Sequence, residues 1–436
     1  MGGPAAAVAA GFHYRFDPIG ERIRLPHPMY VISGGGPVRS LAMNNPELWA
    51  DPRAVIEGRP PGRPGTGIVI GVVVGLGCAL LALGVDLLES LGSSRHSVAP
   101  FLIALPLALL PVPFLIAVVL LLDRLEPEPR ENLVFAFAWG AGIAALLAAV
   151  INTAGLVFIT QPDLGKTTGQ YVSATFGAPV VEESLKGGVL LWLLWRRRQE
   201  FDGPTDGIIY AAMVGLGFAM IENVGYYISA LARPAIGGVP LLGATFVFRG
   251  VLTPLAHPMF TSMTGIGAAY AATHRRGGWA VALGLLAAMT LHGLWNGLTV
   301  FGLAGIVLAY GLLACVLVVL IAVIVADRRR VVRLIRRFLP AYQASGLVTG
   351  AELRMLCTLR ERRAARAWAR SAGGRTAARA MANYQLAATE LALAHQRAER
   401  ETLGAGPSAE REGELAGVMA SARAVFSRYY PSTAGT

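Results

Sequence analysis

The chain has 436 residues, of which 54% are hydrophobic and only 15% are charged, and its mean hydropathy is +0.53. This balance excludes an ordinary soluble globular enzyme and indicates a membrane protein. The formal net charge of +11 must be concentrated in the few polar segments, which we expect to lie against anionic lipid.

The first 66 residues are rich in proline, glycine and arginine. We expect this segment, 1–66, to be mostly disordered and to lie on the cytoplasmic side. The first long apolar run begins only near Gly67, so a cleavable secretory signal is not expected ahead of it. That run should therefore be retained as a membrane span.

Eight apolar runs follow, each close to the roughly 20 residues that cross a hydrocarbon core. They cover residues 67–91, 99–122, 133–160, 172–195, 207–231, 245–272, 279–301 and 303–326. A lone span must satisfy its own backbone hydrogen bonds, and none of the runs alternates with a period of two. The sequence therefore predicts an all-α polytopic membrane protein with about eight transmembrane helices, in a domain over 67–326.

The basic residues between the runs predict an orientation. Loops after the second, fourth and sixth runs carry seven arginines, whereas loops after the first, third and fifth runs carry three basic residues. By the positive-inside rule, both termini are expected to be cytoplasmic. Arginine is far more frequent than lysine, which together with abundant alanine and glycine favours a bacterial source, so we expect a multi-pass protein of the bacterial plasma membrane.

The last segment, 327–436, is basic. Leucines at 353, 356 and 359 have helical spacing, and one or two cationic helices are expected between 345 and 403 on the cytoplasmic side. Membrane lipid is the expected partner of this tail, and nucleic acid is not.

Ionisable side chains at the centre of a span each cost about 2.5 to 3.5 kcal/mol, so they are rare without a function. Here they gather in four consecutive runs. The fourth run holds Glu182, Glu183 and Lys186, the fifth Glu222 and Asn223, the sixth His257, and the seventh His292 and Asn296. Counted from the outer end of each run, Glu183, Glu222, His257 and His292 lie roughly 14 to 18 Å deep, near the bilayer midplane.

Spacing within the runs predicts that these side chains face one cavity. Residues three or four apart share a helical face, which groups Phe218 with Glu222 and Tyr226, and Arg249 with His257 and Thr261. Prolines at 179, 254 and 258 lie close to the polar residues and predict local kinks that open space for water.

A buried carboxylate near a water molecule is a general base, and Lys186 or a metal would keep a neighbouring carboxylate ionised. Two histidines and a glutamate are also a zinc ligand set that leaves one position for water, with Glu222, His257 and His292 as the candidate ligands. The residues leave open whether a metal or a carboxylate activates the water. Neither HExxH nor GxSxG occurs in the chain.

Four motifs carry a resemblance to a known family. They are Glu182-Glu183-x-x-Lys186, Phe218-x-x-x-Glu222-Asn223-x-x-Tyr226, His257-x-x-Phe260-Thr261 and Leu291-His292-x-x-Trp295-Asn296. In order and spacing, over roughly 133–326, they resemble the PrsW family of bacterial intramembrane proteases, within the wider CAAX-protease and bacteriocin-processing superfamily.

The resemblance implies cleavage of a single-span, membrane-anchored substrate, such as an anti-sigma factor. It implies that Glu182 or Glu183 activates the water and that Glu222 and His257 complete the water or metal site. His292 and Asn296 would support the oxyanion or the same site. Lys186, Asn223, Tyr226 and Arg249 would have supporting roles, and zinc would be the cofactor if the site holds a metal.

Three other interpretations remain. The glutamate pair and Lys186 could form a purely structural ion cluster, although this would not explain Glu222. A proton- or ion-coupled transporter would use the same buried groups, but the first four runs contain no second Glu-Glu motif of the kind that an internal repeat produces. A non-catalytic scaffold would tolerate replacement of Glu222.

Overall fold

The computed structural model describes residues 65–92, 97–122, 127–233, 241–400 and 408–430. Within these ranges the chain is almost entirely helical and contains no β-strand, which confirms the predicted all-α class for that part of the chain. The N-terminal segment predicted to be disordered, 1–66, lies outside the described residues except for its last two.

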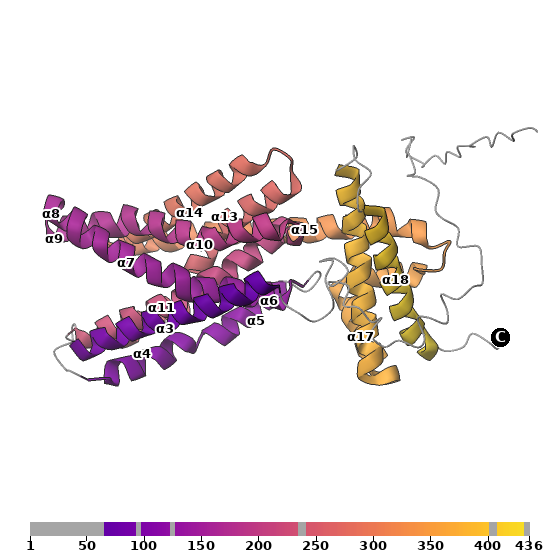
Figure 1. The fold of residues 1–436 in the computed structure, drawn as a ribbon, viewed down its shortest axis with the longest axis horizontal. Helices are drawn as coiled ribbons and strands as arrows, with labels where there is room; N and C mark the ends of the chain where they lie inside the picture. The colour runs from indigo at the N-terminus through magenta and orange to yellow at the C-terminus, as the bar shows by residue number, and fades with distance from the viewer. Residues whose placement is uncertain (1–64, 93–96, 123–126, 234–240, 401–407, 431–436) are drawn as a thin grey trace, which may run out of the picture. The chain divides into compact units, whose positions relative to one another are not determined.

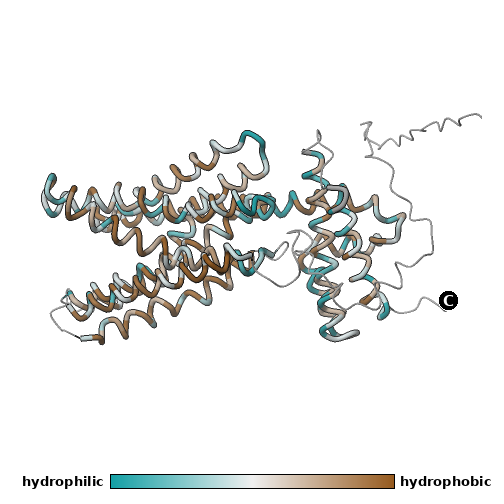
Figure 2. The backbone as a smooth tube through the Cα atoms, viewed as in Figure 1, coloured by the Kyte–Doolittle hydropathy of each residue, from teal (hydrophilic) through white to brown (hydrophobic). Residues whose placement is uncertain are grey.

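Helices fill the apolar part of the chain (Figure 1). They are α3 (Thr66–Gly92), α4 (Ala99–Leu109), α5 (Val112–Leu122), α6 (Arg130–Ala138), α7 (Ala145–Gly155), α8 (Gln161–Leu164), α9 (Lys166–Val172), α10 (Ala178–Arg196), α11 (Pro204–Ala232), α12 (Leu241–Phe246), α13 (Ala256–Thr273), α14 (Gly278–Thr299) and α15 (Gly302–Phe338). Short π-helical turns η2 (Trp139–Ala144), η3 (Leu156–Thr160), η4 (Ser173–Gly177) and η6 (Val247–Leu252) continue several of them. Figure 2 shows apolar residues along most of these helices and hydrophilic residues at the end of α15.

Six helical stretches among the described residues are long and apolar enough to cross a membrane. They are Thr66–Gly92, Ala99–Leu122, Arg130–Leu164, Pro204–Ala232, Gly278–Thr299 and Gly302–Tyr342. The other two expected spans, 172–195 and 245–272, are helical but are not among the six. The first carries the charged residues of α10, and the second is interrupted between η6 and α13. The number eight and the cytoplasmic position of both termini therefore stay predictions.

The break before α13 follows from proline chemistry. Pro254 has no N–H to donate to a helix, and helical hydrogen bonding stops at residues 253–255. Just before the break, the backbone N–H and the Oγ1 of Thr253 both donate to the carbonyl oxygen of Phe248, at 2.9 and 2.7 Å. The break places His257 in the first turn of α13, so the kink expected near Pro254 and Pro258 is present.

Helix α11 is the most enclosed of the six, with 89% of its most apolar 18-residue window buried. Its burial depends on glycines that let other backbones approach closely. At Gly207 an added Cβ would collide with the backbone of Gly265 in α13, and an added Cβ at Gly265 would collide in turn with Gly207. Helices of a membrane protein pack in this way when small residues meet at the crossing point.

Gly207→Ala is therefore expected to destabilise the protein by about 1 to 3 kcal/mol, because one methyl group overpacks the α11–α13 crossing. Gly84→Ala in α3 is the matched control, since nothing lies within 4 Å of a Cβ added there. We expect that control to be neutral or slightly stabilising. Thermal unfolding in detergent measures both, and equal stability of the two variants would contradict the close approach.

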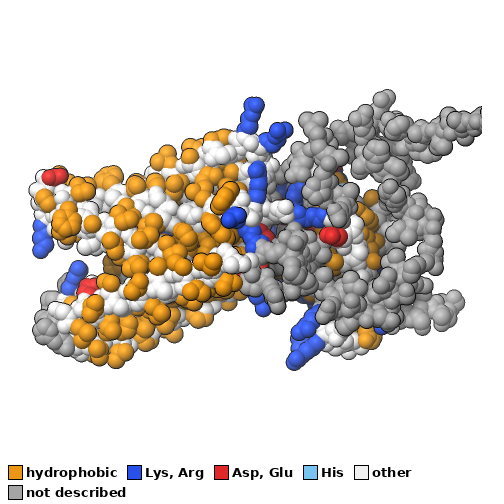
Figure 3. All heavy atoms as spheres, viewed as in Figure 1, with side chains coloured by type: hydrophobic (Ala, Val, Ile, Leu, Met, Phe, Trp, Pro, Cys, Tyr) orange, Lys and Arg blue, Asp and Glu red, His pale blue; other side chains and the backbone are white. Residues whose placement is uncertain are grey.

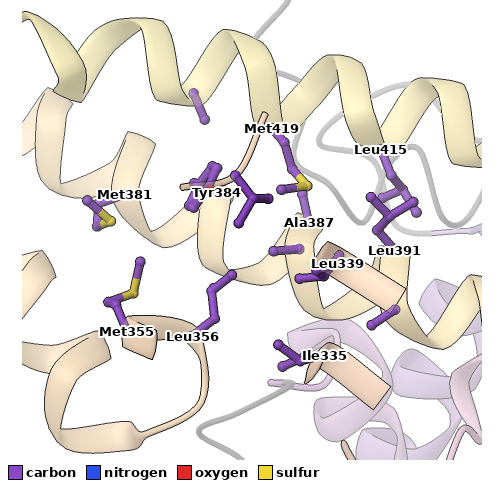
Figure 4. Close-up of a cluster of buried hydrophobic side chains, with 14 of the residues drawn as sticks. Ile335, Leu339, Met355, Leu356, Met381, Tyr384, Ala387, Leu391, Leu415 and Met419 are labelled. Atoms are coloured by element: carbon purple, nitrogen blue, oxygen red, sulfur yellow. The ribbon is translucent and has the colours of Figure 1, made fainter. Parts of the chain in front are cut away.

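The chain beyond the apolar part packs around a core of its own. Helix α15 continues through residue 327 without a break, and η7 (Leu339–Tyr342), α16 (Gly350–Leu356), α17 (Leu359–Arg400) and α18 (Ser408–Phe426) follow. Helix α17 is kinked at Gly373 and Gly374, where a φ of +68° at Gly374 suits glycine. Figure 4 shows Leu356, Tyr384 and Met419 in the buried apolar cluster that joins these helices.

Polar contacts connect the end of α17 and the end of α15 to the loop before α11. Arg397 Nη2 donates to Asp202 Oδ2 at 2.7 Å, and Arg330 Nη2 donates to the carbonyl oxygen of Asp202 at 2.9 Å. Two helices, α16 and α17, lie between 345 and 403, as predicted, and ion pairs such as that of Arg423 Nε with Glu352 Oε1 at 2.9 Å connect α18 to them.

Candidate functional site

Helices α10, α11, α13 and α14 bring together the polar residues that were predicted from the sequence. Glu182, Glu183 and Lys186 lie on one face of α10, where spacings of three and four residues place them side by side. Glu222 comes from α11, His257 from the first turn of α13 and His292 from α14. The burial of Glu183 and Lys186 is complete, and each is 0% exposed.

Lys186 lies at the centre of this cluster. Its Nζ donates to Glu182 Oε2 at 3.1 Å and to Glu183 Oε1 at 3.0 Å. A third hydrogen bond joins Nζ to His257 Nδ1 at 2.9 Å, and the ring centroid of Phe218 lies 3.7 Å from Nζ. An ammonium group has three N–H donors and no acceptor, so all its donors are used and Nδ1 of His257 must accept.

The proton of neutral His257 is therefore on Nε2, which donates to Glu222 Oε2 at 2.9 Å. Glu222 also forms an ion pair with Arg249, and Arg249 Nε donates to Asn223 Oδ1 at 2.7 Å. The guanidinium lies 3.7 Å from the ring centroid of Tyr226. Glu222, Asn223, Tyr226 and Arg249 thus form one connected group beside the lysine-centred cluster.

Both carboxylate oxygens of Glu183 accept hydrogen bonds. Its Oε1 accepts from Lys186 and from His292 Nδ1 at 3.0 Å, and its Oε2 accepts from Thr261 Oγ1 at 2.8 Å. Because Nδ1 of His292 donates to a carboxylate, the lone pair of the neutral imidazole is on Nε2. That Nε2 lies 3.9 Å from Glu182 Oε2. A carboxylate that fixes a histidine in this way is the usual support of a basic or metal-binding imidazole.

Glu182 occupies a different environment from its neighbour. Its Oε1 accepts from Asn152 Nδ2 at 3.3 Å, and its side chain lines a cavity of about 760 Å³ that is bounded by α3, α7 and α11. Glu222 lines the same cavity, whereas Glu183 does not. Of the two neighbouring glutamates, Glu182 is therefore the one that faces space for water and substrate.

Among the predicted site residues, Asn296 has its hydrogen bond outside the cluster. Its Nδ2 donates to the carbonyl oxygen of Ala174 at 2.8 Å, which ties α14 to η4. No hydrogen bond joins Asn296 to a carboxylate or imidazole of the cluster within the described ranges. Its position fits a residue that holds the helix of His292 in place.

Three contacts were not predicted from the sequence as parts of the site. Thr261 and Phe218 lay on the expected inward faces, at four residues from His257 and Glu222, but were not assigned to the cluster. Asn152 was missed entirely, although a single amide in an apolar span is itself a signal of an interhelical hydrogen bond.

The donor set for a metal differs from the expected one. One oxygen of Glu182 and one nitrogen each of His257 and His292 lie within 4.8 Å of one another, and this is the group of three that the described residues offer. Glu182 thus takes the place expected for Glu222, which is held by Arg249. Glutamate with two histidines suits zinc, and His292 Nε2 has a free lone pair. Lys186, however, already binds Glu182 and His257, so its ammonium must move before both could bind a metal.

The comparisons with known proteins agree with the motifs. Residues 128–326 match the model of the PrsW family, described as intramembrane metalloproteases. The chain is 30% identical over 128 residues to Protease PrsW of Oceanobacillus iheyensis, an alignment that covers 29% of this chain and 54% of the relative. It is 30% identical over 143 residues to Protease PrsW of Geobacillus kaustophilus, covering 33% of this chain and 55% of the relative.

A third relative, Protease PrsW of Clostridioides difficile, is 31% identical over 143 residues, with the same two coverages of 33% and 55%. The chain therefore spans about half the length of the curated relatives it matches. No solved structure matches significantly. The predicted resemblance to the PrsW family is confirmed over residues 128–326.

Proposed function

From the match of residues 128–326 to the PrsW family, we propose that this chain is an intramembrane endopeptidase that hydrolyses a peptide bond of a membrane-anchored protein. The observation that carries the proposal is the position of Glu182. This carboxylate belongs to the buried Lys186 cluster and also lines the 760 Å³ cavity, so a buried base meets a space large enough for a peptide. A single-span protein is the substrate class, and an anti-sigma factor is the candidate that the resemblance implies.

The geometry around Glu182 supports one route of hydrolysis. A water molecule held between Glu182 and His292 Nε2 would give a proton to Glu182 as its oxygen bonds to the carbonyl carbon of the substrate. The electron pair of the C=O bond moves to the oxygen, whose negative charge the buried ammonium of Lys186, 3.1 Å from Glu182 Oε2, would stabilise through its field. When the C=O bond re-forms, the C–N bond breaks, and Glu182 returns the proton to the leaving nitrogen.

The neighbouring residues keep this arrangement in place. Glu183 orients His292 and, with Lys186, fixes the face of α10. Asn296 holds α14 against η4. Zinc, when bound by Glu182, His257 and His292, would supply Lewis-acid activation of water in place of a carboxylate base.

The proposal is tested with purified protein in liposomes that contain a single-span reporter, with and without a chelator, beside elemental analysis for zinc. We expect cleavage within or next to the reporter's apolar segment. The control is Asp163→Asn, because Asp163 is an exposed carboxylate of α8 outside the cluster. This variant protein should cleave the reporter as fast as the wild type does. Near-stoichiometric zinc with chelator-sensitive cleavage would assign the metal mechanism, and cleavage without zinc would assign the carboxylate mechanism.

A transporter that uses the same buried groups remains the alternative, although the family match does not favour it. A Glu182-dependent proton or cation flux across the same liposomes, with no cleavage of any reporter, would overturn the protease proposal.

A further inference from the structure

The cavity beside Glu182 is bordered by three helices. Its lining residues repeat every three or four positions on α3 and α11, so one face of each of these helices borders the space. On α7, every position from Ala145 to Ala154 except Leu147 and Ile151 belongs to the lining. Most of the lining is alanine, valine and other apolar side chains, such as Ala82 and Ala149. Figure 3 shows the surface hollowed at the left of the view, where Figure 1 places α7 above and α3 and α4 below.

The charged residues in the lining are all acidic. Glu182 and Glu222 form its polar end and are paired with Lys186 and Arg249. Asp86 and Glu89, one turn apart on α3, line the same space. Neither of these two has a hydrogen bond or an ion pair with any residue that the structure describes.

Asp86 lies close to the acidic end of the cavity, where Glu182 and Glu222 border it. A Cβ added to Gly225 would lie 3.4 Å from Asp86 Oδ1, so this oxygen is level with Gly225 on α11. Gly225 follows Glu222 by three residues, a rise of about 4.5 Å along the helix axis. An extended peptide rises about 3.3 Å per residue, so Asp86 faces the substrate one or two residues away from the level of Glu222, which borders the cavity together with Glu182.

We infer that the cleft between α3, α7 and α11 receives the membrane segment of the substrate in extended form, and that Asp86 selects a lysine or arginine one or two residues from the cut bond. The inference rests on the proposed protease function. Glu182 and Glu222 border the cleft, so a substrate segment that lies in it reaches the reacting atoms. Its apolar walls suit a membrane segment, and an unpaired carboxylate in such surroundings favours a cationic partner.

The preference for a basic residue is measured with three single-span reporters that differ at one position. This position is the second residue from the mapped cut, on the side toward the outer end of the cleft, and it is Lys, Ala or Glu. We expect wild-type protein to cleave the Lys reporter about tenfold faster than the Ala reporter. Asp86→Asn should bring that ratio to within about twofold, and Asp86→Lys should shift the preference to the Glu reporter. Asp163→Asn should keep the wild-type ratio. A ratio that survives in Asp86→Asn would overturn the role of Asp86.

The path itself is tested without hydrolysis, by cysteine crosslinking in a Glu182→Gln background. The test variant is Ala149→Cys, because Ala149 lines the cleft on α7. The control is Leu147→Cys, because Leu147 is on the same helix but outside the lining. We expect the reporter's span to crosslink at 149, more with the Lys than with the Ala reporter, and not at 147.

The two readouts separate failure of the inference from failure of the proposed function. Crosslinking at 147 but not at 149, with normal cleavage, would overturn the cleft and leave the protease proposal standing. If the reporter crosslinks at 149 but the wild-type protein cuts no reporter, the cleft would be supported as a binding site and the proposed protease function would be overturned.

Discussion

Glu182→Gln is expected to lower the rate of reporter cleavage about 10²- to 10⁴-fold, because the amide cannot accept the proton of the attacking water. The fold should be little changed, since the amide oxygen of glutamine can still accept from Lys186. The amide N–H₂ would face Asn152, whose side chain also borders the cavity and can turn its own oxygen toward it. The measurement is the cleavage rate in liposomes beside thermal unfolding of the same preparation.

Glu183→Gln is the informative comparison because the two glutamates are adjacent. Three donors point at the Glu183 carboxylate, from Lys186, His292 and Thr261. An amide N–H₂ in place of one oxygen would face a donor, so this variant should lose about 1 to 3 kcal/mol of stability. If Glu183→Gln were stable and inactive while Glu182→Gln kept most of its activity, the assignment of the base would have to be reversed.

Most of the site could be predicted from two features of the sequence, the helical spacing of its polar residues and the free-energy cost of burying charged side chains. Charged groups in apolar helices must find partners, and positions three and four apart share a face, so Glu183, Lys186 and His257 were expected to meet. The structure brings them together with Glu222 and His292. The depth of the cluster in a bilayer stays a prediction, because it depends on the membrane around the helices.

The features that the sequence did not predict depend on how each helix is rotated about its axis and on which side chains of other helices it contacts. Helical spacing places Glu182 and Glu183 on one face, but it does not say which of them borders the cavity. The expected ligand set named Glu222, whereas Arg249, one turn before the break at Pro254, takes that carboxylate. Asn152 was missed because its partner lies on another helix, 30 residues away.

Lys186→Met is expected to destabilise the protein by about 3 to 5 kcal/mol, which is the cost of leaving buried carboxylates without their cation. Lys186 now supplies the positive charge between Glu182, Glu183 and His257. Methionine fills a similar volume, so the loss reports the charge rather than a cavity. Thermal or denaturant unfolding in detergent measures it.

Zinc should reverse part of that loss if Glu182, His257 and His292 can hold it, because the ammonium that competes for two of these ligands is gone. We therefore expect added zinc to raise the Tm of Lys186→Met more than that of the wild type, by ligand linkage and without reference to activity. Lys166→Met is the matched control, since Lys166 is the only other lysine and is exposed on α9. An equal response of all three proteins to zinc would mean that Lys186 does not occupy a metal position. Its ammonium would then be the permanent cation of the site, and the carboxylate mechanism would be favoured.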